Sequence, residues 1–223
     1  MLRVPVTNFD YIAGTLRPLW RGKLHALAVV ASPVAWGYLL SISKTFVTVI
    51  GSTVYAIGIL LCFGMSSVYH ILCKTKKTQN IFRRLDHSFI YFLIAGTYTP
   101  LCLTVLSGSQ RWAALGLLWA VSLTGVYLKM RAKAVKLATT FYLVLGWSSL
   151  LMLPSLYNAA GILPILLLFL GGVAYTLGAI LFRKRVPVLS REVFSYHEVW
   201  HAMTILAAAF HYGAVYMVLT SAV

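Results

Sequence analysis

Three histidines have the spacing and placement of a metal site. His197 and His201 are four residues apart, so on a helix their imidazoles project from one face and can bind the same ion. His70 lies much earlier in the chain, near the end of another apolar stretch, and its depth there makes it the best third ligand. Three histidines and a water form the tetrahedral arrangement that zinc uses where chemistry occurs. The sequence therefore predicts a zinc site at His70, His197 and His201.

Two further polar residues are placed to assist hydrolysis at such a site. Ser66 precedes His70 by four residues, so it lies on the same helical face one turn deeper. Asp86 stands at the start of the next apolar stretch and offers a carboxylate that can act as a general base. Because aspartate also caps helix amino termini, Asp86 has a second interpretation as the cap of that span. Ser66 is expected to orient the water or to stabilise charge.

The run from His197 to His201 also reads HEVWH, which matches the HExxH signature of zinc proteases with Glu198 as base. Intramembrane proteases of this kind need a later aspartate ligand, and no acidic residue follows Glu198, so a protease is the weaker alternative. His211 is ten residues beyond His201, about 15 Å along a helix, and cannot share its metal. The remaining histidines begin apolar stretches and are open to a site role or an interfacial one: His25 and His87.

The elements that carry these residues are expected to be membrane helices. Of the 223 residues, 60% are apolar and 10% are charged, which is more apolar surface than a soluble core of this size could hide. The first 23 residues mix proline, glycine and charge and lack a signal-peptide pattern, so a cytoplasmic tail is expected. The net charge of +15 indicates basic loops and attraction to anionic lipid rather than nucleic-acid binding.

Seven apolar stretches are long enough to cross a bilayer, which predicts an all-α integral membrane protein, a seven-transmembrane helix bundle. The short connections indicate one domain over residues 1–223. Glycines that recur at helical intervals in the second and sixth stretches predict close helix packing. The expected spans are 24–42, 46–72, 88–106, 112–128, 137–153, 162–182 and 199–218.

Basic residues predict the orientation. Of the 19 lysines and arginines, 17 fall in the first 23 residues or in the loops that join spans two and three, four and five, and six and seven. Only Lys44 and Arg111 fall in the other loops. Since positive loops stay in the cytoplasm, the amino terminus is expected inside and the carboxyl terminus outside the cell membrane. This orientation puts His70, Asp86 and His197 at one depth, near the cytoplasmic boundary.

Several runs match the motifs of a known membrane protein family. SSVYH, ending at His70, resembles a Ser-xxx-His motif that closes a second span, and LDH at 85–87 with IAGTYTP at 94–100 resembles a third-span block. HEVWH at 197–201 and FH at 210–211 resemble a seventh-span block. On these runs the chain resembles, over nearly its whole length, the hemolysin III family. This family is the bacterial branch of the progestin and adipoQ receptor superfamily that includes the adiponectin receptors.

The resemblance implies zinc held by His70, His197 and His201, with Asp86 and Ser66 around a zinc-bound water. It implies a zinc-dependent hydrolase of lipid amide or ester bonds, similar to a ceramidase, that takes membrane lipids from the inner leaflet. The alternative is a non-enzymatic membrane-perturbing (hemolytic) or lipid-sensing protein with a structural zinc. Hormone reception is not expected, because the short tail has no counterpart of the animal receptors' cytoplasmic extension. No nucleic acid or protein partner is implied.

Overall fold

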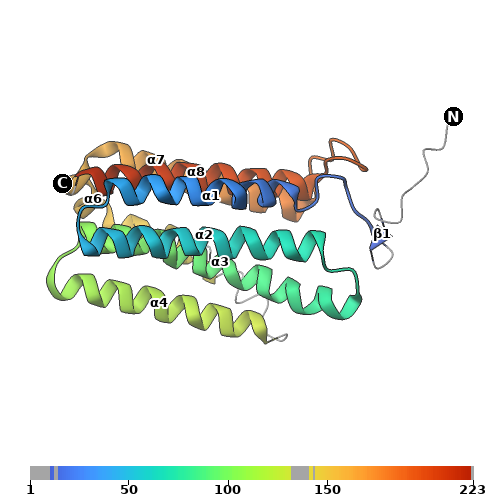
Figure 1. Cartoon of the computed structure of the whole chain (residues 1–223), viewed down its shortest axis with the longest axis horizontal. Helices are drawn as coiled ribbons and strands as arrows, with labels where there is room; N and C mark the ends of the chain where they lie inside the picture. Colours follow the sequence, from blue (N-terminus) through green and yellow to red (C-terminus); the bar gives the residue numbers. More distant parts are fainter. Residues whose placement is uncertain (1–10, 13–14, 132–140, 143, 222–223) are drawn as a thin grey trace.

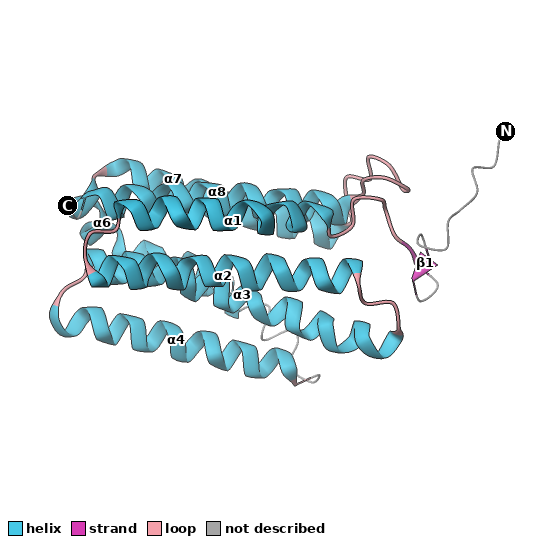
Figure 2. Cartoon of the chain, in the orientation of Figure 1, coloured by secondary structure: helices cyan, strands magenta, loops and turns pink. Residues whose placement is uncertain are grey.

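Helices make up almost all of the described structure. The computed structural model describes residues 11–12, 15–131, 141–142 and 144–221. The long helices lie side by side along the long axis of the molecule (Figure 1), and short loops join them (Figure 2). An antiparallel pair of short strands, β1 (Tyr11–Ile12) and β2 (Thr15–Leu16), precedes the first helix. In chain order the helices are α1 (Lys23–Ile42), α2 (Phe46–Ile71), α3 (Lys76–Val105), α4 (Gly108–Met130), the 3-10 helix η2 (Ser148–Met152), α6 (Leu153–Ala160), α7 (Ile162–Lys184) and α8 (Tyr196–Ser221).

The described part of the chain contains six helices that are long and apolar enough to cross a membrane, namely α1, α2, α3, α4, α7 and α8. Large apolar side chains face outward from them, including Val34 at 78% and Phe46 at 80% exposure. Such broad apolar surfaces are stable against lipid tails and not against water. The chain is an all-helical, multi-pass membrane protein.

The expected fifth span, 137–153, falls partly outside the described residues, at 137–140 and 143. From residue 144 the chain is helical up to 147 and continues through η2 into α6. Pro154 occupies the first turn of α6, where its missing N–H is not needed for the helix ladder. Helix α6 packs against α7 and α8, so this region belongs to the same bundle.

Helix α3 begins at Lys76 and not near Ser88, where the apolar stretch starts. Its amino terminus carries a capping box in which Thr75 and Thr78 bond reciprocally to each other's backbone N–H groups. Asp86 therefore lies well inside α3, and its interpretation as a helix cap is wrong. The basic residues before Ser88 form a polar first part of the helix, which a search for apolar stretches does not include.

Glycines allow α2 and α3 to pack closely, as predicted. A Cβ on Gly58 of α2 would lie 2.9 Å from the backbone oxygen of Phe92 and 3.5 Å from Gly96 Cα on α3. A Cβ on Gly51 would lie 2.9 Å from Pro100 Cα. Any larger side chain at these two positions would force the helices apart. This contact joins the first half of α2 to the apolar part of α3.

Helix α8 holds a central place in the bundle. It packs against α7, α1, α3 and α6, and its buried face includes Ala207, Ala214 and Val215. Small side chains on that face let the neighbouring helices approach closely. The first turns of α8 thereby reach the end of α2 and the start of α1, where the predicted site residues are found.

Candidate metal centre

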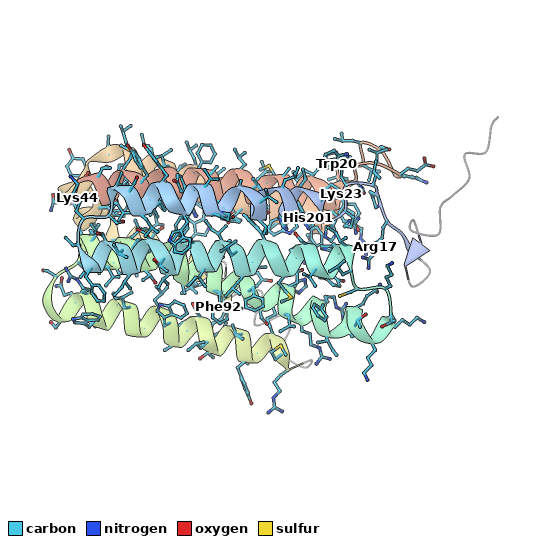
Figure 3. All side chains as sticks on the ribbon, viewed as in Figure 1. Arg17, Trp20, Lys23, Lys44, Phe92 and His201 are labelled. Carbon is cyan, nitrogen blue, oxygen red and sulfur yellow. The ribbon has the colours of Figure 1, made fainter. Side chains whose placement is uncertain are left out.

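Three imidazoles from two helices meet at one end of the bundle. The Nε2 atom of His70, in the last turn of α2, lies 3.2 Å from Nε2 of His197, in the first turn of α8. His201 follows one turn along α8, and one ring nitrogen from each of the three lies within 4.8 Å of the others. We call His70, His197 and His201 the His cluster. Figure 3 shows His201 near the end of the bundle that carries Arg17, and Lys44 at the opposite end.

The geometry of the His cluster suits a metal ion. Two nitrogens bound to tetrahedral zinc at about 2.0–2.1 Å lie about 3.3 Å apart. The separation between His70 and His197 is 3.2 Å. The Nδ1 atom of His201 is buried and has no hydrogen-bond partner among the described residues. Burying a polar atom without a partner destabilises the folded protein unless a ligand binds the ring. The described residues thus contain a His triad able to hold a metal, as the spacing predicted.

Ser66 and Asp86, the predicted assisting residues, contact each other. Their side chains form a hydrogen bond between α2 and α3, in which the Ser66 hydroxyl donates to the carboxylate. Ser66 is only 2% exposed. It precedes His70 by four residues of helix, a rise of about 6 Å. The Ser66–Asp86 pair is thus about one turn deeper in the bundle than His70.

A fourth histidine packs against the cluster. The ring of His25, near the start of α1, stacks on the ring of His201 with centroids 4.0 Å apart. Its Nε2 atom lies 2.9 Å from the Thr204 hydroxyl oxygen, and its other face stacks on Phe63 at 4.7 Å. His25 is 4% exposed, so it is a buried neighbour of the site and not an interfacial residue. It fixes the plane of the His201 ring.

Glu198 is fully buried and is held by two partners. Its Oε2 atom accepts the backbone N–H of Ser195 at 2.8 Å, which is half of a capping box at the start of α8. Its Oε1 atom accepts from Nε of Arg21 in an ion pair. Both carboxylate oxygens are therefore engaged in holding the start of α8 to the chain before α1. This structural role accounts for Glu198 between His197 and His201, and no catalytic role is needed to explain it.

The segment of residues 17–22, which we call the N-terminal strap, is bound to the loop between α7 and α8. Backbone N–H groups of Leu19 and Trp20 donate to the carbonyls of Glu192 at 2.8 Å and Val193 at 3.2 Å. These bonds satisfy backbone groups of the strap and of the loop. The strap is therefore attached to the loop that leads into α8.

The N-terminal strap also contacts the end of α2. Nη1 of Arg17 donates to the backbone oxygen of His70 at 2.7 Å. Gly22 has φ +80°, and a Cβ there would lie 2.7 Å from Cβ of His70. Only glycine tolerates both the positive φ and this close approach. The strap thus fixes the position of the α2 end that presents His70.

A pocket of about 510 Å³ lies between the N-terminal strap, the end of α2 and the α7–α8 loop. His70 and His197 line it, so the pocket reaches two members of the His cluster. Arg17, Arg21 and Arg191 also line it. Because Arg191 is exposed, the pocket extends to the surface of the protein.

The other histidines lie away from the cluster or have other partners. His211 packs on Gly171 of α7, where a Cβ would lie 2.3 Å from its ring, and it hydrogen bonds to the backbone of Leu168. It ties α8 to α7 and has no place in the His cluster, as its distance along the helix predicted. His87 is partly buried on α3 and belongs to no metal-ligand group among the described residues.

The sequence alone does not identify the residues that position the cluster. It marks Arg17 and Arg21 only as basic charges and leaves the role of His25 open. One signal for Glu198 was present, because Ser195 and Glu198 have the Ser-x-x-Glu spacing of a capping box. The contact of Arg21 with Glu198 joins residues 177 positions apart, and no local pattern predicts it.

The fold and the site define a multi-pass membrane protein with a three-histidine cluster at one end of its helix bundle. Residues 14–212 match the family model described as "Haemolysin-III related". The chain is 31% identical to the "Hemolysin-3 homolog" of Bacillus subtilis (strain 168), covering 83% of this chain and 86% of that protein. It is 30% identical to "Hemolysin-3" of Bacillus cereus, covering 82% of each. It is 29% identical to the human "Monocyte to macrophage differentiation factor", covering 86% of this chain and 80% of that protein.

The chain belongs to the haemolysin III family. Weaker similarity to adiponectin receptor proteins places the family within the progestin and adipoQ receptor superfamily, as the sequence motifs indicated. The protein is a multi-pass protein of the cell membrane.

Proposed function

We propose that the protein is a zinc-dependent hydrolase of amide or ester bonds in membrane lipids. The observation that carries this proposal is the juxtaposition of the His cluster with the Ser66–Asp86 pair one turn deeper. A metal site near a hydrogen-bonded carboxylate has the parts that hydrolysis of a carbonyl group requires. A purely structural zinc site has four protein ligands. The cluster supplies three histidines, which leaves one position for water or substrate.

The residues of this chain have separate roles in the proposed reaction. Zinc held by the His cluster would polarise the lipid carbonyl and activate water near neutral pH. Asp86 takes the proton from the attacking water and returns it to the leaving group. Ser66 holds the Asp86 carboxylate in place through its hydrogen bond. His25 holds the His201 ring by stacking, so that its nitrogen keeps one direction.

The proposal includes seven spans with a cytoplasmic amino terminus and an extracytoplasmic carboxyl terminus. The distribution of lysine and arginine supports this orientation. It places the His cluster near the cytoplasmic boundary, so the lipid substrate enters from the inner leaflet. Membrane lipids are then the only partners that the proposed function needs.

Two alternatives can be separated from this proposal. An HExxH protease needs the Glu198 carboxylate as a free base. The bonds of this carboxylate to Ser195 and Arg21 weigh against that role. A non-enzymatic protein that perturbs membranes or senses lipids, with a structural zinc, is supported by the name of the Bacillus cereus relative, "Hemolysin-3". That alternative predicts metal binding and membrane leakage without product formation.

The test uses the purified full chain in detergent or lipid nanodiscs. Metal content is measured by mass spectrometry, and fatty-acid release is measured from a panel that contains a ceramide, a phospholipid and a neutral ester. We expect about one zinc per chain and release from at least one lipid class. A protein with full zinc content and no release from the whole panel would overturn the hydrolase, and leakage of dye-loaded vesicles under those conditions would favour the hemolytic alternative.

A further inference from the structure

The pocket at the end of the bundle has an excess of positive charge. Arg17, Arg21 and Arg191 line it, and each comes from the N-terminal strap or the α7–α8 loop. The only carboxylate that pairs with them in the described structure is Glu198, through Arg21. Of the three arginines, only Arg21 pairs with this carboxylate, which also accepts a backbone N–H from Ser195. Among the described residues that line it, the pocket therefore has no carboxylate to balance its arginines.

Most of the donors on these arginines have no partner among the described residues, which leaves them for a ligand. A guanidinium carries five N–H donors in a fixed fork. Nε of Arg21 donates to Glu198, and Nη1 of Arg17 donates to the backbone of His70. Burial lowers the pKa of Arg17 below the usual arginine value, chiefly through loss of solvation. An anion in the pocket would replace the solvation that the guanidinium has lost.

The two strap arginines are held in place before any ligand arrives. The carbonyl of His70 fixes Arg17, and the Glu198 carboxylate fixes Arg21. The strap backbone is fixed in turn by its bonds to Glu192 and Val193. A prearranged pair of arginines loses little side-chain entropy on binding, which favours recognition of a tetrahedral anion.

We propose that this pocket binds a phosphate group, with Arg17, Arg21 and Arg191 as its ligands. Guanidinium forks match phosphate oxygens in bidentate pairs. The side chains of Tyr69, Gln79 and Tyr196 also line the pocket and bring further hydrogen-bonding groups. The phosphate belongs to a lipid head group at the membrane surface or to a soluble phosphate compound, since both present the same oxygens.

The phosphate site differs from the His cluster in its residues and does not require hydrolysis. Its ligands are arginines of the strap and the loop, while the metal site uses imidazoles of α2 and α8. His70 and His197 belong both to the His cluster and to the pocket lining, so a bound phosphate would lie beside the metal site. If the proposed hydrolase is correct, this arrangement favours lipids with a phosphate head group as substrates or activators.

The experiment measures phosphate binding to the full-length protein in a maltoside detergent, which itself carries no phosphate. The probes are inorganic phosphate and dioctanoyl phosphatidic acid, with dioctanoyl glycerol as the neutral control, followed by calorimetry. Each titration is done on metal-loaded protein and on protein treated with a chelator, because a metal can bind phosphate by itself. The variants are Arg191→Gln, which alters an exposed side chain, and Arg17→Gln. The matched control is Lys44→Gln, an exposed cation at the opposite end of the bundle.

We expect at least one phosphate probe to bind with and without metal, and Arg191→Gln to weaken that binding about tenfold or more. Lys44→Gln should leave the affinity within about twofold of the unaltered protein, because its charge is far from the pocket. Binding of phosphatidic acid alone identifies a lipid head group, and binding of inorganic phosphate identifies a site that also takes free phosphate. The proposal is overturned if neither probe binds, if binding occurs only with metal, or if the Arg191 and Lys44 variants bind equally.

Discussion

The Nε2 atoms of His70 and His197 lie 3.2 Å apart, although 127 positions separate the two residues in the chain. Without a metal, one of these nitrogens has to carry the proton that the other accepts. With a metal, both lone pairs point at the ion and His201 adds a third nitrogen. The distance is close to that of two ligands on one tetrahedral ion.

Removing one ligand tests the His cluster. We expect His201→Ala to reduce bound zinc from about one per chain to less than about a tenth, because two remaining imidazoles hold zinc weakly. The control is His211→Gln, which alters a histidine of the same helix outside the cluster. Metal analysis of the two purified variants measures the zinc bound per chain. Equal zinc in His201→Ala and His211→Gln would contradict the assigned site.

Asp86 is expected to act in the reaction and not in metal binding. Asp86→Asn should lower turnover of the lipid substrate about 100-fold or more while zinc content stays unchanged, since the amide cannot take up a proton. Ser66→Ala should give a smaller loss, because the carboxylate remains but loses its hydrogen bond. Turnover and zinc content are measured on the same preparations. Full activity in Asp86→Asn would refute its role as general base.

The ion pair between Arg21 and Glu198 is expected to stabilise the fold. Glu198→Gln should lower the free energy of unfolding by about 2 kcal/mol, because it leaves the partly buried Arg21 without its counter-charge. The double variant Arg21→Gln with Glu198→Gln should lose less than the sum of the single changes. Denaturant unfolding in detergent measures the three values. Strictly additive losses would show that the pair does not interact. Loss of lipid hydrolysis at unchanged stability would instead give Glu198 a role in catalysis.

Close packing between α2 and α3 is expected to depend on Gly58. Gly58→Ala should lower the thermal midpoint by several degrees, because its Cβ would lie 2.9 Å from a backbone oxygen of α3. The control is Gly37→Ala on α1, whose Cβ would meet nothing within 4 Å. Alanine favours a helix over glycine, so the control should be neutral or slightly stabilising. Equal thermal midpoints for Gly58→Ala and Gly37→Ala would contradict the prediction.

Metal removal is expected to destabilise the bundle. A ligand that binds only the folded state adds to its stability, so a chelator should lower the thermal midpoint of the zinc-loaded protein. His201→Ala should melt at the same temperature with and without chelator. Differential scanning fluorimetry with a thiol-reactive dye can follow both proteins, because all three cysteines are buried in the folded state. An equal chelator effect on the variant would point to a metal elsewhere.

The helices were largely predictable because a bilayer imposes a simple rule on composition. Apolar stretches gave the first two helices nearly to the residue, at 24–42 and 46–72 against Lys23–Ile42 and Phe46–Ile71. The start of α3 lies outside the predicted span because its first turns carry basic residues. Only the capping pair Thr75 and Thr78 marks that start, and a polar helix outside the membrane gives no apolar signal.

The candidate site was predictable only in its ligands. His197 and His201 share a helical face by spacing alone, and His70 followed from its depth in the membrane. The contacts that hold the cluster are tertiary, such as His25 on His201 and Arg17 on the backbone of His70. They join segments that no periodicity connects, so a single sequence could not reveal them.

The ligands of the His cluster come from α2 and from the first turns of α8, which follows every other described helix along the chain. A ribosome makes His70 early and His197 and His201 late, so a partly synthesised chain carries only one of the three cluster imidazoles and would not retain zinc. If the cluster holds zinc as proposed, metal loading would be a step of maturation, after the last of these helices has entered the bilayer. Shortage of the ion during growth would then leave finished but empty copies that zinc added later can still fill.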